Sequence, residues 1–345
     1  MKIRFFNPGL GYLKIKDEID TEIQRVLIAG DLILRKDVED FEKNLAEYIG
    51  TKYAVALNSG TDALYLALKA MDVGVGDEVL VPSHTFVATA QVVNQVGATI
   101  VLMDLDGKFK VSEKTRVIMP CHIAGEFGGN MKLITETAKM LNLIVIEDAC
   151  QALGAVQDGK KAGSWGDIGC FSFYPAKILG AYGDAGAITT NNEDLANQIK
   201  ELRNHYKKDY SQWGINSRMD NLQAAILNVK FKYLQEYLDK RKEIATLYLD
   251  NLRDLEERGL IKLPKNTPNR CWQDFILRTE KRDELYEFLK KEGIETMKNE
   301  YLFPIPKMLQ SIQYEAETLR LPCNPDLTIQ EIFEVIDKIR KFYGA

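Results

Sequence analysis

The chain has few cysteines, no excess of basic residues and no long apolar run. Its five cysteines, at positions 121, 150, 170, 271 and 323, form no CxxC pair and lack the spacing of a disulfide framework. The net charge of -5 supplies no basic field that would recruit nucleic acid. No apolar run reaches the roughly 18 residues needed to cross a bilayer. We therefore predict no nucleic-acid partner, no membrane association and no metal site.

The composition is that of an ordinary globular protein, with 46% hydrophobic and 28% charged residues. The first residues lack the longer apolar stretch and the small-residue cleavage site of a signal peptide. Unpaired cysteines suit a reducing compartment, so a cytoplasmic location is expected. At 345 residues the chain is long enough for a large domain and a smaller one. We predict a large domain over 1–235, and a linking helix with a small domain over 236–345.

Short β-branched runs alternate with helical patterns in the first two thirds of the chain. Several of these runs are continuously apolar, which is typical of strands covered by helices on both faces. The fold class is therefore α/β with a mainly parallel sheet between helices. The seven predicted strands are 53–57, 78–81, 99–103, 116–120, 143–147, 168–173 and 186–190.

From Met219 an apolar stripe with helical spacing runs to about Leu255, which predicts one long amphipathic helix. Pro264 and Pro268 then mark a linker. A short strand at 275–277 and helices at 282–291 and 328–343 follow. This last part of the chain is predicted to form a small C-terminal α/β domain.

A turn between a predicted strand and a helix offers an anion site. Asn58-Ser59-Gly60-Thr61 follows the strand 53–57 and opens a helix over 62–71. Free N–H groups and the positive end of the helix dipole allow Gly60 and Thr61 to bind a phosphate. The alternative is an ordinary helix cap made by Ser59 or Thr61.

Asp148 closes the strand 143–147 in the middle of the predicted sheet, at the edge where open α/β folds bind ligands. A carboxylate there can pair with a protonated pyridine nitrogen and keep the ring cationic. The alternative is a cap on the next helix. Gln151 can contact a phenolic oxygen of the same ring or face solvent.

Lys177 stands in Ser172-Phe173-Tyr174-Pro175-Ala176-Lys177, and Gly180 follows it closely. Proline and glycine favour a fixed turn. A lysine beside a cationic cofactor loses its proton more easily, as Schiff-base chemistry requires. A solvated loop lysine is the alternative, but Ser172 and Asp148 fall where a cofactor needs them. Together these residues indicate a site for pyridoxal 5'-phosphate (PLP).

The same motifs resemble those of the DegT/DnrJ/EryC1/StrS sugar aminotransferases, a family of fold-type I PLP-dependent transferases. The resemblance covers nearly the whole chain. It is carried by the segments 30–34, 58–64, 82–90, 147–152, 172–177, 183–187 and 216–219. It implies a large domain with a seven-stranded, mainly parallel sheet and a smaller C-terminal domain.

The resemblance implies a role for each cofactor-site position. Lys177 forms the internal aldimine with PLP and then moves protons, and Asp148 pairs with the pyridine nitrogen. Gln151 contacts the ring oxygen, and Phe86 stacks on the ring, although a core phenylalanine is the alternative. The phosphate is held by Gly60, Thr61, Ser172 and, from the other subunit of a homodimer with shared active sites, Asn216.

Substrate contacts are expected from His84, His122, His205, Arg218 and Tyr301. Structural histidines are the alternative for His84 and His122, and a solvated loop is the alternative for His205. Arg218 either binds a nucleotide phosphate or lies in the dimer interface. Tyr301 lies in Asn299-Glu300-Tyr301-Leu302-Phe303-Pro304, where the family usually has His-Tyr-Pro. Ile178 also departs from the family, which usually has asparagine after the lysine.

The implied reaction is a ping-pong transamination. L-glutamate donates its amino group, pyridoxamine 5'-phosphate forms as an intermediate, and a keto group of a nucleotide-linked sugar is aminated. Residues 173–175 and 179–184 are more similar to family members that act at C-3 than to those that act at C-4. The alternatives are a C-4 aminotransferase, a non-catalytic PLP-binding regulatory protein and a nicotinamide-dependent sugar oxidoreductase.

Overall fold

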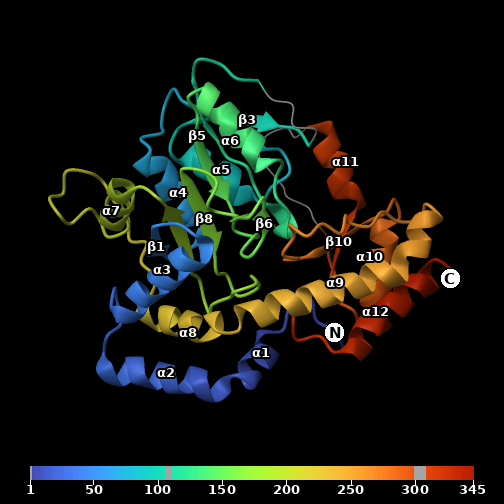
Figure 1. Ribbon diagram of the computed structural model, residues 1–345. Helices are drawn as coiled ribbons and strands as arrows, with labels where there is room; N and C mark the ends of the chain where they lie inside the picture. Colours follow the sequence, from blue (N-terminus) through green and yellow to red (C-terminus); the bar gives the residue numbers. More distant parts are fainter. Residues whose placement is uncertain (1, 106–109, 299–307) are drawn as a thin grey trace.

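The computed structural model describes residues 2–105, 110–298 and 308–345. Within these ranges a seven-stranded sheet forms the centre of the larger part of the molecule (Figure 1). Its strands are β1 (Tyr53–Leu57), β2 (Glu78–Pro82), β3 (Thr99–Met103), β4 (Thr115–Ile118), β5 (Ile144–Asp148), β8 (Ile168–Ser172) and β9 (Gly186–Thr190). These are the seven strands that the sequence predicts, with bounds that differ by at most two residues.

The strand order is β1-β9-β8-β5-β4-β2-β3. The pairs β5/β8, β4/β5, β2/β4 and β2/β3 are parallel, whereas β9 pairs antiparallel with both β8 and β1. The predicted α/β class with a mainly parallel sheet is therefore confirmed. The carboxyl ends of β5 and β8 lie side by side, so Asp148 and Ser172 come to the same edge of the sheet.

Helices cover both faces of this sheet. One buried cluster joins the strands to α4 (Gly60–Ala70), α5 (Val87–Gln95) and α7 (Glu193–Leu202). The other joins them to α3 (Lys36–Ile49), α6 (Met131–Met140) and α8 (Asn221–Phe231). Val145 belongs to the second cluster and its neighbour Ile146 to the first. Both faces are thus buried, which explains why the strands are continuously apolar.

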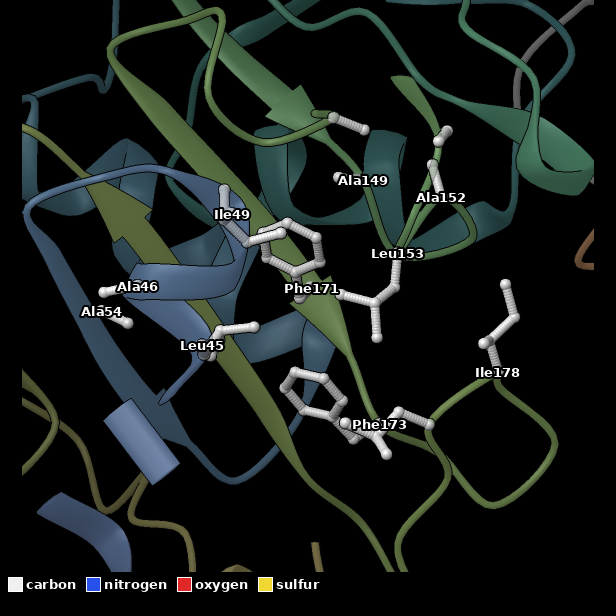
Figure 2. Packing of buried hydrophobic residues seen from close by; sticks show 14 of the residues in the cluster. Leu45, Ala46, Ile49, Ala54, Ala149, Ala152, Leu153, Phe171, Phe173 and Ile178 are labelled. Carbon is white, nitrogen blue, oxygen red and sulfur yellow. The ribbon is translucent and has the colours of Figure 1, made fainter. Parts of the chain in front are cut away.

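The end of β8 packs firmly into the second cluster. Phe171 and Phe173 lie beside Leu45 and Ile49 of α3 (Figure 2). The rings of Phe41 and Phe173 meet edge to face with their centroids 5.1 Å apart, a favourable aromatic geometry. Ile178, on the loop after β8, belongs to the same cluster and is 4% exposed. The turn that carries Lys177 is therefore held by apolar packing on both sides.

The single long helix predicted from Met219 is wrong. The structure has two helices there, α8 (Asn221–Phe231) and α9 (Leu234–Glu257). Between them the N–H groups of Lys232 and Tyr233 bond to the carbonyls three residues earlier, on Val229 and Lys230. This tighter turn interrupts the regular pattern without a proline or a glycine. The apolar stripe continues across the break, so the sequence gives no sign of it.

A second, three-stranded sheet lies in the last third of the chain, with the order β10-β12-β11. Its strands are β10 (Phe275–Arg278), β11 (Met297–Lys298) and β12 (Thr318–Leu321). Helices α9, α10 (Arg282–Lys291) and α12 (Ile329–Phe342) pack on it around a separate buried cluster. The predicted strand at 275–277 and the helices at 282–291 and 328–343 match β10, α10 and α12.

The start of the chain joins this smaller core, although the domain boundaries predicted from the sequence place it in the large domain. Ile3 forms a bridge with Ile294 and is fully buried among the apolar side chains of the smaller sheet. Both labelled termini accordingly lie on that side of the molecule (Figure 1). The predicted division at 235/236 falls in the first turn of α9, between the two sheets.

The remaining described elements are short or peripheral. They are α1 (Pro8–Lys14), α2 (Lys16–Ala29), the 3-10 helix η1 (Ile123–Gly125), β6 (Val156–Gln157), β7 (Lys160–Lys161) and α11 (Leu309–Glu317). Among the helices in the described ranges, none has the length and apolar character to cross a membrane.

Glu147, the penultimate residue of β5, is a fully buried carboxylate. It accepts backbone hydrogen bonds from Gly163 (2.9 Å), Trp165 (2.7 Å) and Gly166 (2.8 Å). His122 adds a fourth through Nε2, at 3.0 Å. One side chain thus ties the loop before β8 to the loop after β4.

We expect Glu147→Ala to lower the free energy of unfolding by about 3 kcal/mol, because four buried donors lose their acceptor. Chemical denaturation of the purified variant measures the change. The matched control is Glu136→Ala, which removes an exposed glutamate on α6 and should change stability by less than about 0.5 kcal/mol. Equal stability of the two variants would contradict the role given to Glu147.

Candidate active site

Asp148 lies at the carboxyl end of β5 and is 4% exposed. Its Oδ2 atom accepts a hydrogen bond from the Thr89 hydroxyl at 2.7 Å, and its Oδ1 atom accepts one from the Cys150 N–H at 3.2 Å. Thr89 belongs to α5 and is itself fully buried. The carboxylate is thus fixed in direction by two donors from different elements. A buried carboxylate held in this way can bind a cationic N–H group.

The amino end of α4 meets the end of β8. Ser59 caps the helix by accepting the Asp62 N–H at 3.0 Å. A Cβ atom on Gly60 would lie 2.7 Å from the Ser172 Cβ and 2.9 Å from the Cys150 Sγ, so only glycine allows this approach. The capping role that the sequence left open therefore belongs to Ser59. Gly60 and Thr61 begin the helix beside Ser172, in the arrangement that binds phosphates.

Lys177 lies in a closed turn that follows β8. Its N–H donates to the Tyr174 carbonyl at 2.8 Å, and the Ala181 N–H donates to the Phe173 carbonyl at 2.8 Å. A Cβ atom on Gly180 would be 2.1 Å from the Pro175 oxygen, so the chain folds back tightly there. The solvated-loop alternative for Lys177 does not fit this turn.

Burial of the Lys177 amine lowers its pKa from the ordinary value. Cys150, Asp274 and Asp148 raise this pKa, and Arg320 lowers it, but desolvation is the largest effect. These groups act on Lys177 because the loop after β5 and the residue just before β10 lie close to it. The amine is therefore neutral over a wider pH range than that of an exposed lysine, as a nucleophilic lysine requires.

Gln151 and Phe86 flank the same edge of the sheet. The Gln151 side chain is 8% exposed, and its Oε1 atom accepts the Ala124 N–H at 2.9 Å. It does not face solvent, which was one of its two alternatives. Phe86 precedes α5 and is 53% exposed, so the core alternative does not hold for it. Their contacts with the cofactor ring remain predictions.

The segment 216–218 lies beside the phosphate turn. Ser217 accepts the Asn58 N–H at 3.2 Å through its hydroxyl, while the neighbouring Asn216 is exposed. Arg218 donates from Nη1 to the Asn204 side chain at 3.0 Å. An exposed Asn216 is free to reach a second chain. Whether Arg218 binds a nucleotide phosphate or lies in an interface stays a prediction.

The histidines fall in three different settings. His122 is fully buried: Nδ1 accepts the Gly128 N–H at 3.1 Å and Nε2 lies 3.0 Å from Glu147. Both ring nitrogens are used, so the structural alternative holds and the predicted substrate contact does not. His205 is exposed, with a left-handed φ of 64°. It lies on the loop after α7 that extends from the body of the molecule (Figure 1).

His84 is 5% exposed and its Nδ1 lies 3.0 Å from Glu315 of α11. It borders a cavity of about 1090 Å³ between α6 and the smaller sheet, lined also by Cys121, Arg270 and Arg278. Its substrate contact therefore remains a prediction. Tyr301 lies outside the described residues.

Sequence reasoning missed Thr89, which fixes Asp148. The available signal was its position on α5, three residues after Phe86 and so on the same side of that helix. The residue appears in the sequence motif 82–90, but nothing local shows that its hydroxyl reaches a carboxylate on another element.

A sequence model of the DegT/DnrJ/EryC1/StrS aminotransferase family matches residues 13–340. The geometry described above and this match agree, and the chain belongs to this family. The predicted family, and with it the enzyme class of PLP-dependent sugar aminotransferases, is confirmed.

Three curated relatives show how wide the similarity is. The dTDP-3-amino-3,4,6-trideoxy-alpha-D-glucose transaminase of Streptomyces venezuelae is 34% identical, over 99% of this chain and 96% of its own. The dTDP-3-amino-3,6-dideoxy-alpha-D-galactopyranose transaminase of Aneurinibacillus thermoaerophilus is 38% identical, over 96% of each. A pleiotropic regulatory protein of Geobacillus stearothermophilus is 37% identical over 99% of each.

Solved structures agree with the fold. The structure of S. venezuelae DesV in complex with a ketimine intermediate has a TM-score of 0.92 at 34% identity, covering 99% of this chain and 98% of DesV. NtdA of Bacillus subtilis with bound cofactor PMP has a TM-score of 0.86 at 30% identity, covering 94% and 82%. The predicted fold class is confirmed, and PLP is the cofactor of this family.

The residues present in this chain fit PLP. Gly60 lies close against Ser172 at the amino end of α4, where unpaired N–H groups can bind a phosphate. The buried Asp148 carboxylate suits a cationic ring nitrogen, and the lowered pKa of Lys177 suits covalent binding of an aldehyde. These three groups come from α4, β5 and the loop after β8, all at one edge of the sheet.

The lowered pKa of Lys177 predicts a measurable difference from exposed lysines. In cofactor-free protein, Lys177 should reach half of its maximal acylation rate at a lower pH than exposed lysines do, because its amine loses its proton earlier. Competitive labelling over a pH series, with mass spectrometry of the peptides, measures each midpoint. A Lys177 midpoint equal to that of the exposed lysines would contradict the desolvation of this side chain.

Proposed function

We propose that this protein transfers an amino group from L-glutamate to the C-3 keto group of a nucleotide-linked keto-deoxysugar. The proposal is based on two side chains that lie at one edge of the sheet. Burial lowers the pKa of Lys177, and the Asp148 carboxylate, held by Thr89, is among the groups that act on that amine. The two transaminase relatives named above support C-3, because both are named for 3-amino sugars. The product would serve the synthesis of a surface glycan or a glycosylated metabolite.

Each residue has a distinct task in this proposal. PLP, when bound, withdraws electrons from the substrate carbon and carries the amino group from donor to acceptor. The Asp148 carboxylate holds the proton on the ring nitrogen, and Thr89 and the Cys150 N–H keep that carboxylate in place. The neutral Lys177 amine would take the proton from the substrate carbon and return it to the carbon two bonds away, on the other side of the nitrogen.

The phosphate contacts keep the cofactor in the site throughout both half-reactions. Gly60, Thr61 and Ser172 surround the start of α4 and would bind the phosphate dianion. Phe86 and Gln151 would restrain the ring plane and its oxygen. We assign these roles from the positions of the residues at the edge of the sheet.

We infer that the active site is shared in a homodimer. Asn216 is exposed next to Ser217, which itself contacts the phosphate turn of its own chain. Exposed apolar side chains also gather at the end of α2 and just after it, where Ile28 is 86% exposed, with Leu27, Leu32 and Ile33 beside it in the chain. Such a patch is typical of an interface.

The alternative of a non-catalytic PLP-binding regulatory protein has one observation in its favour. The regulatory relative from G. stearothermophilus is as similar to this chain as the transaminases are. A PLP-binding regulator would load the cofactor but would not complete a turnover. A C-4 aminotransferase would use the same cofactor residues, so the substrate panel below has to distinguish the two positions. The nicotinamide-dependent alternative is not supported, because the matching family is one of aminotransferases.

The test is a panel of 3-keto and 4-keto nucleotide sugars, each incubated with L-glutamate, PLP and the purified protein. We expect 2-oxoglutarate to form together with a 3-amino sugar, identified by mass spectrometry. Lys177→Ala is the control and should abolish turnover, because no other amine replaces it at this turn. Amination at C-4 would correct the regiochemistry, and consumption of no sugar together with no 2-oxoglutarate would favour the regulatory alternative.

Asp148→Asn should lower kcat on the order of 10²-fold, because an amide of the same shape cannot hold the ring proton. The matched control is Asp250→Asn on the exposed side of α9, which should leave kcat unchanged. Steady-state kinetics with L-glutamate measures both variants. Wild-type kcat in Asp148→Asn would show that another group protonates the ring.

A further inference from the structure

Residues 270–274, which we call the crossing segment, form the last part of the connection from α9 to β10 and contact the loops after β4 and β5. The Cys271 N–H donates to the Gly125 carbonyl at 3.0 Å, in the loop after β4. The Cys271 thiol contacts the Gln151 carbonyl at 3.8 Å, in the loop after β5. A Cβ atom on Gly125 would lie 2.8 Å from the Gln273 nitrogen, so the two backbones are in close contact.

Within this segment, Gln273 bonds to the backbone on both sides of Lys177. Its Nε2 atom donates to the Ala176 carbonyl at 3.0 Å, and its Oε1 atom accepts the Ile178 N–H at 3.0 Å. Gln273 is 6% exposed, so water does not replace these bonds easily. The pair of bonds requires one donor and one acceptor on the same side chain, which a neutral amide provides.

The backbone of Gln273 is held in turn by the smaller part of the molecule. Arg241 of α9 is 3% exposed, and its Nη1 atom donates to the Gln273 carbonyl at 2.8 Å and to the Cys323 carbonyl, just beyond β12, at 2.9 Å. The next residue, Asp274, pairs with Arg320 of β12 at 2.8 Å. The backbone of Gln273 is therefore held by residues of the smaller part of the molecule, and its side chain contacts the lysine turn.

We propose that Gln273 is a positioning residue that sets the direction of the Lys177 amine and links the small domain to the cofactor site. The proposal rests on the role given to Lys177 under the proposed function. Gln273 holds the carbonyl of Ala176 and the N–H of Ile178. These two bonds fix the peptide planes on either side of Lys177 and so the direction of its side chain. Small errors in the position of a reacting group cost large factors in rate. A movement of the small domain would act on the lysine turn through the two Gln273 hydrogen bonds.

The chain contains a second glutamine with the same pair of bonds at a different place. Gln157 accepts the Met131 N–H at 2.7 Å and donates to the Gly129 carbonyl at 3.2 Å. These bonds hold the turn before α6 and touch no residue of the lysine turn. Gln157→Leu is therefore a matched control, since it removes as many backbone contacts as Gln273→Leu does.

The first measurement is hydrogen exchange in cofactor-free, full-length protein. We expect the Ile178 amide to be protected in the wild type and to exchange at least about tenfold faster in Gln273→Leu, because its acceptor is lost. The same amide should keep its wild-type rate in Gln157→Leu. An unprotected Ile178 amide in the wild-type protein, or equal exchange rates in the wild type and Gln273→Leu, would overturn the proposal.

The second measurement uses Gln273→Glu and the pH midpoint of Lys177 acylation. Glutamate still accepts the Ile178 N–H but cannot donate to Ala176, and its negative charge favours the protonated amine. The midpoint should therefore move to higher pH, while Gln157→Glu should leave it unchanged. An unchanged acylation midpoint in Gln273→Glu would overturn the proposal that this side chain acts on Lys177. This midpoint can be measured even if Gln273→Leu does not fold.

The third measurement separates positioning from stability in the loaded enzyme. Gln273→Leu should lower kcat on the order of tenfold while the KM for L-glutamate stays within about twofold. Gln157→Leu should leave kcat unchanged. Equal kcat values in the two variants would overturn the proposal. If the wild type aminates no sugar, the proposed function fails, while exchange and acylation still decide whether Gln273 holds the lysine turn.

Discussion

The two carboxylates that end β5 point to opposite sides of the sheet, and the rest of the site depends on this. Neighbouring residues of a strand alternate in direction. Glu147 consequently binds the loop 163–166 and His122, while Asp148 meets Thr89 of α5 on the other side. A slip of one residue in β5 would exchange their places. The register of one central strand thus decides which carboxylate holds the neighbouring loops and which lies at the proposed cofactor site.

Much of the fold was predictable because its strands are buried on both faces. An apolar run such as Ile144–Ile146 is typical of a strand covered on both faces, although the edge strand β3 is only partly buried. The break between α8 and α9 was not predictable, because it is made by backbone hydrogen bonds of Lys232 and Tyr233 that span three residues and involve no proline or glycine. The position of Ile3 was not predictable either, because its partner Ile294 is far away in the sequence and the residues around Ile3 do not indicate the pairing.

The candidate site shows the same division between local and distant causes. Asp148, Ser172 and Gly60 come together because strand ends and helix starts share one edge of the sheet, which the sequence pattern already implies. The alternatives for His122 were settled only by its partners Glu147 and Gly128. Gln273 has no motif at all, because its importance comes from the path of the crossing segment over loops that are distant in the sequence.

The burial of Ile3 in the core of the smaller sheet has a consequence for synthesis on the ribosome. That core needs residues from near the start of the chain together with β10, β12 and α12 from its last third. The seven-stranded sheet, by contrast, is complete once Thr190 has emerged. Because domains fold as units during translation, Ile3 reaches its place in this core only after β12 and α12 have been made. The larger sheet can therefore form before the core that buries Ile3.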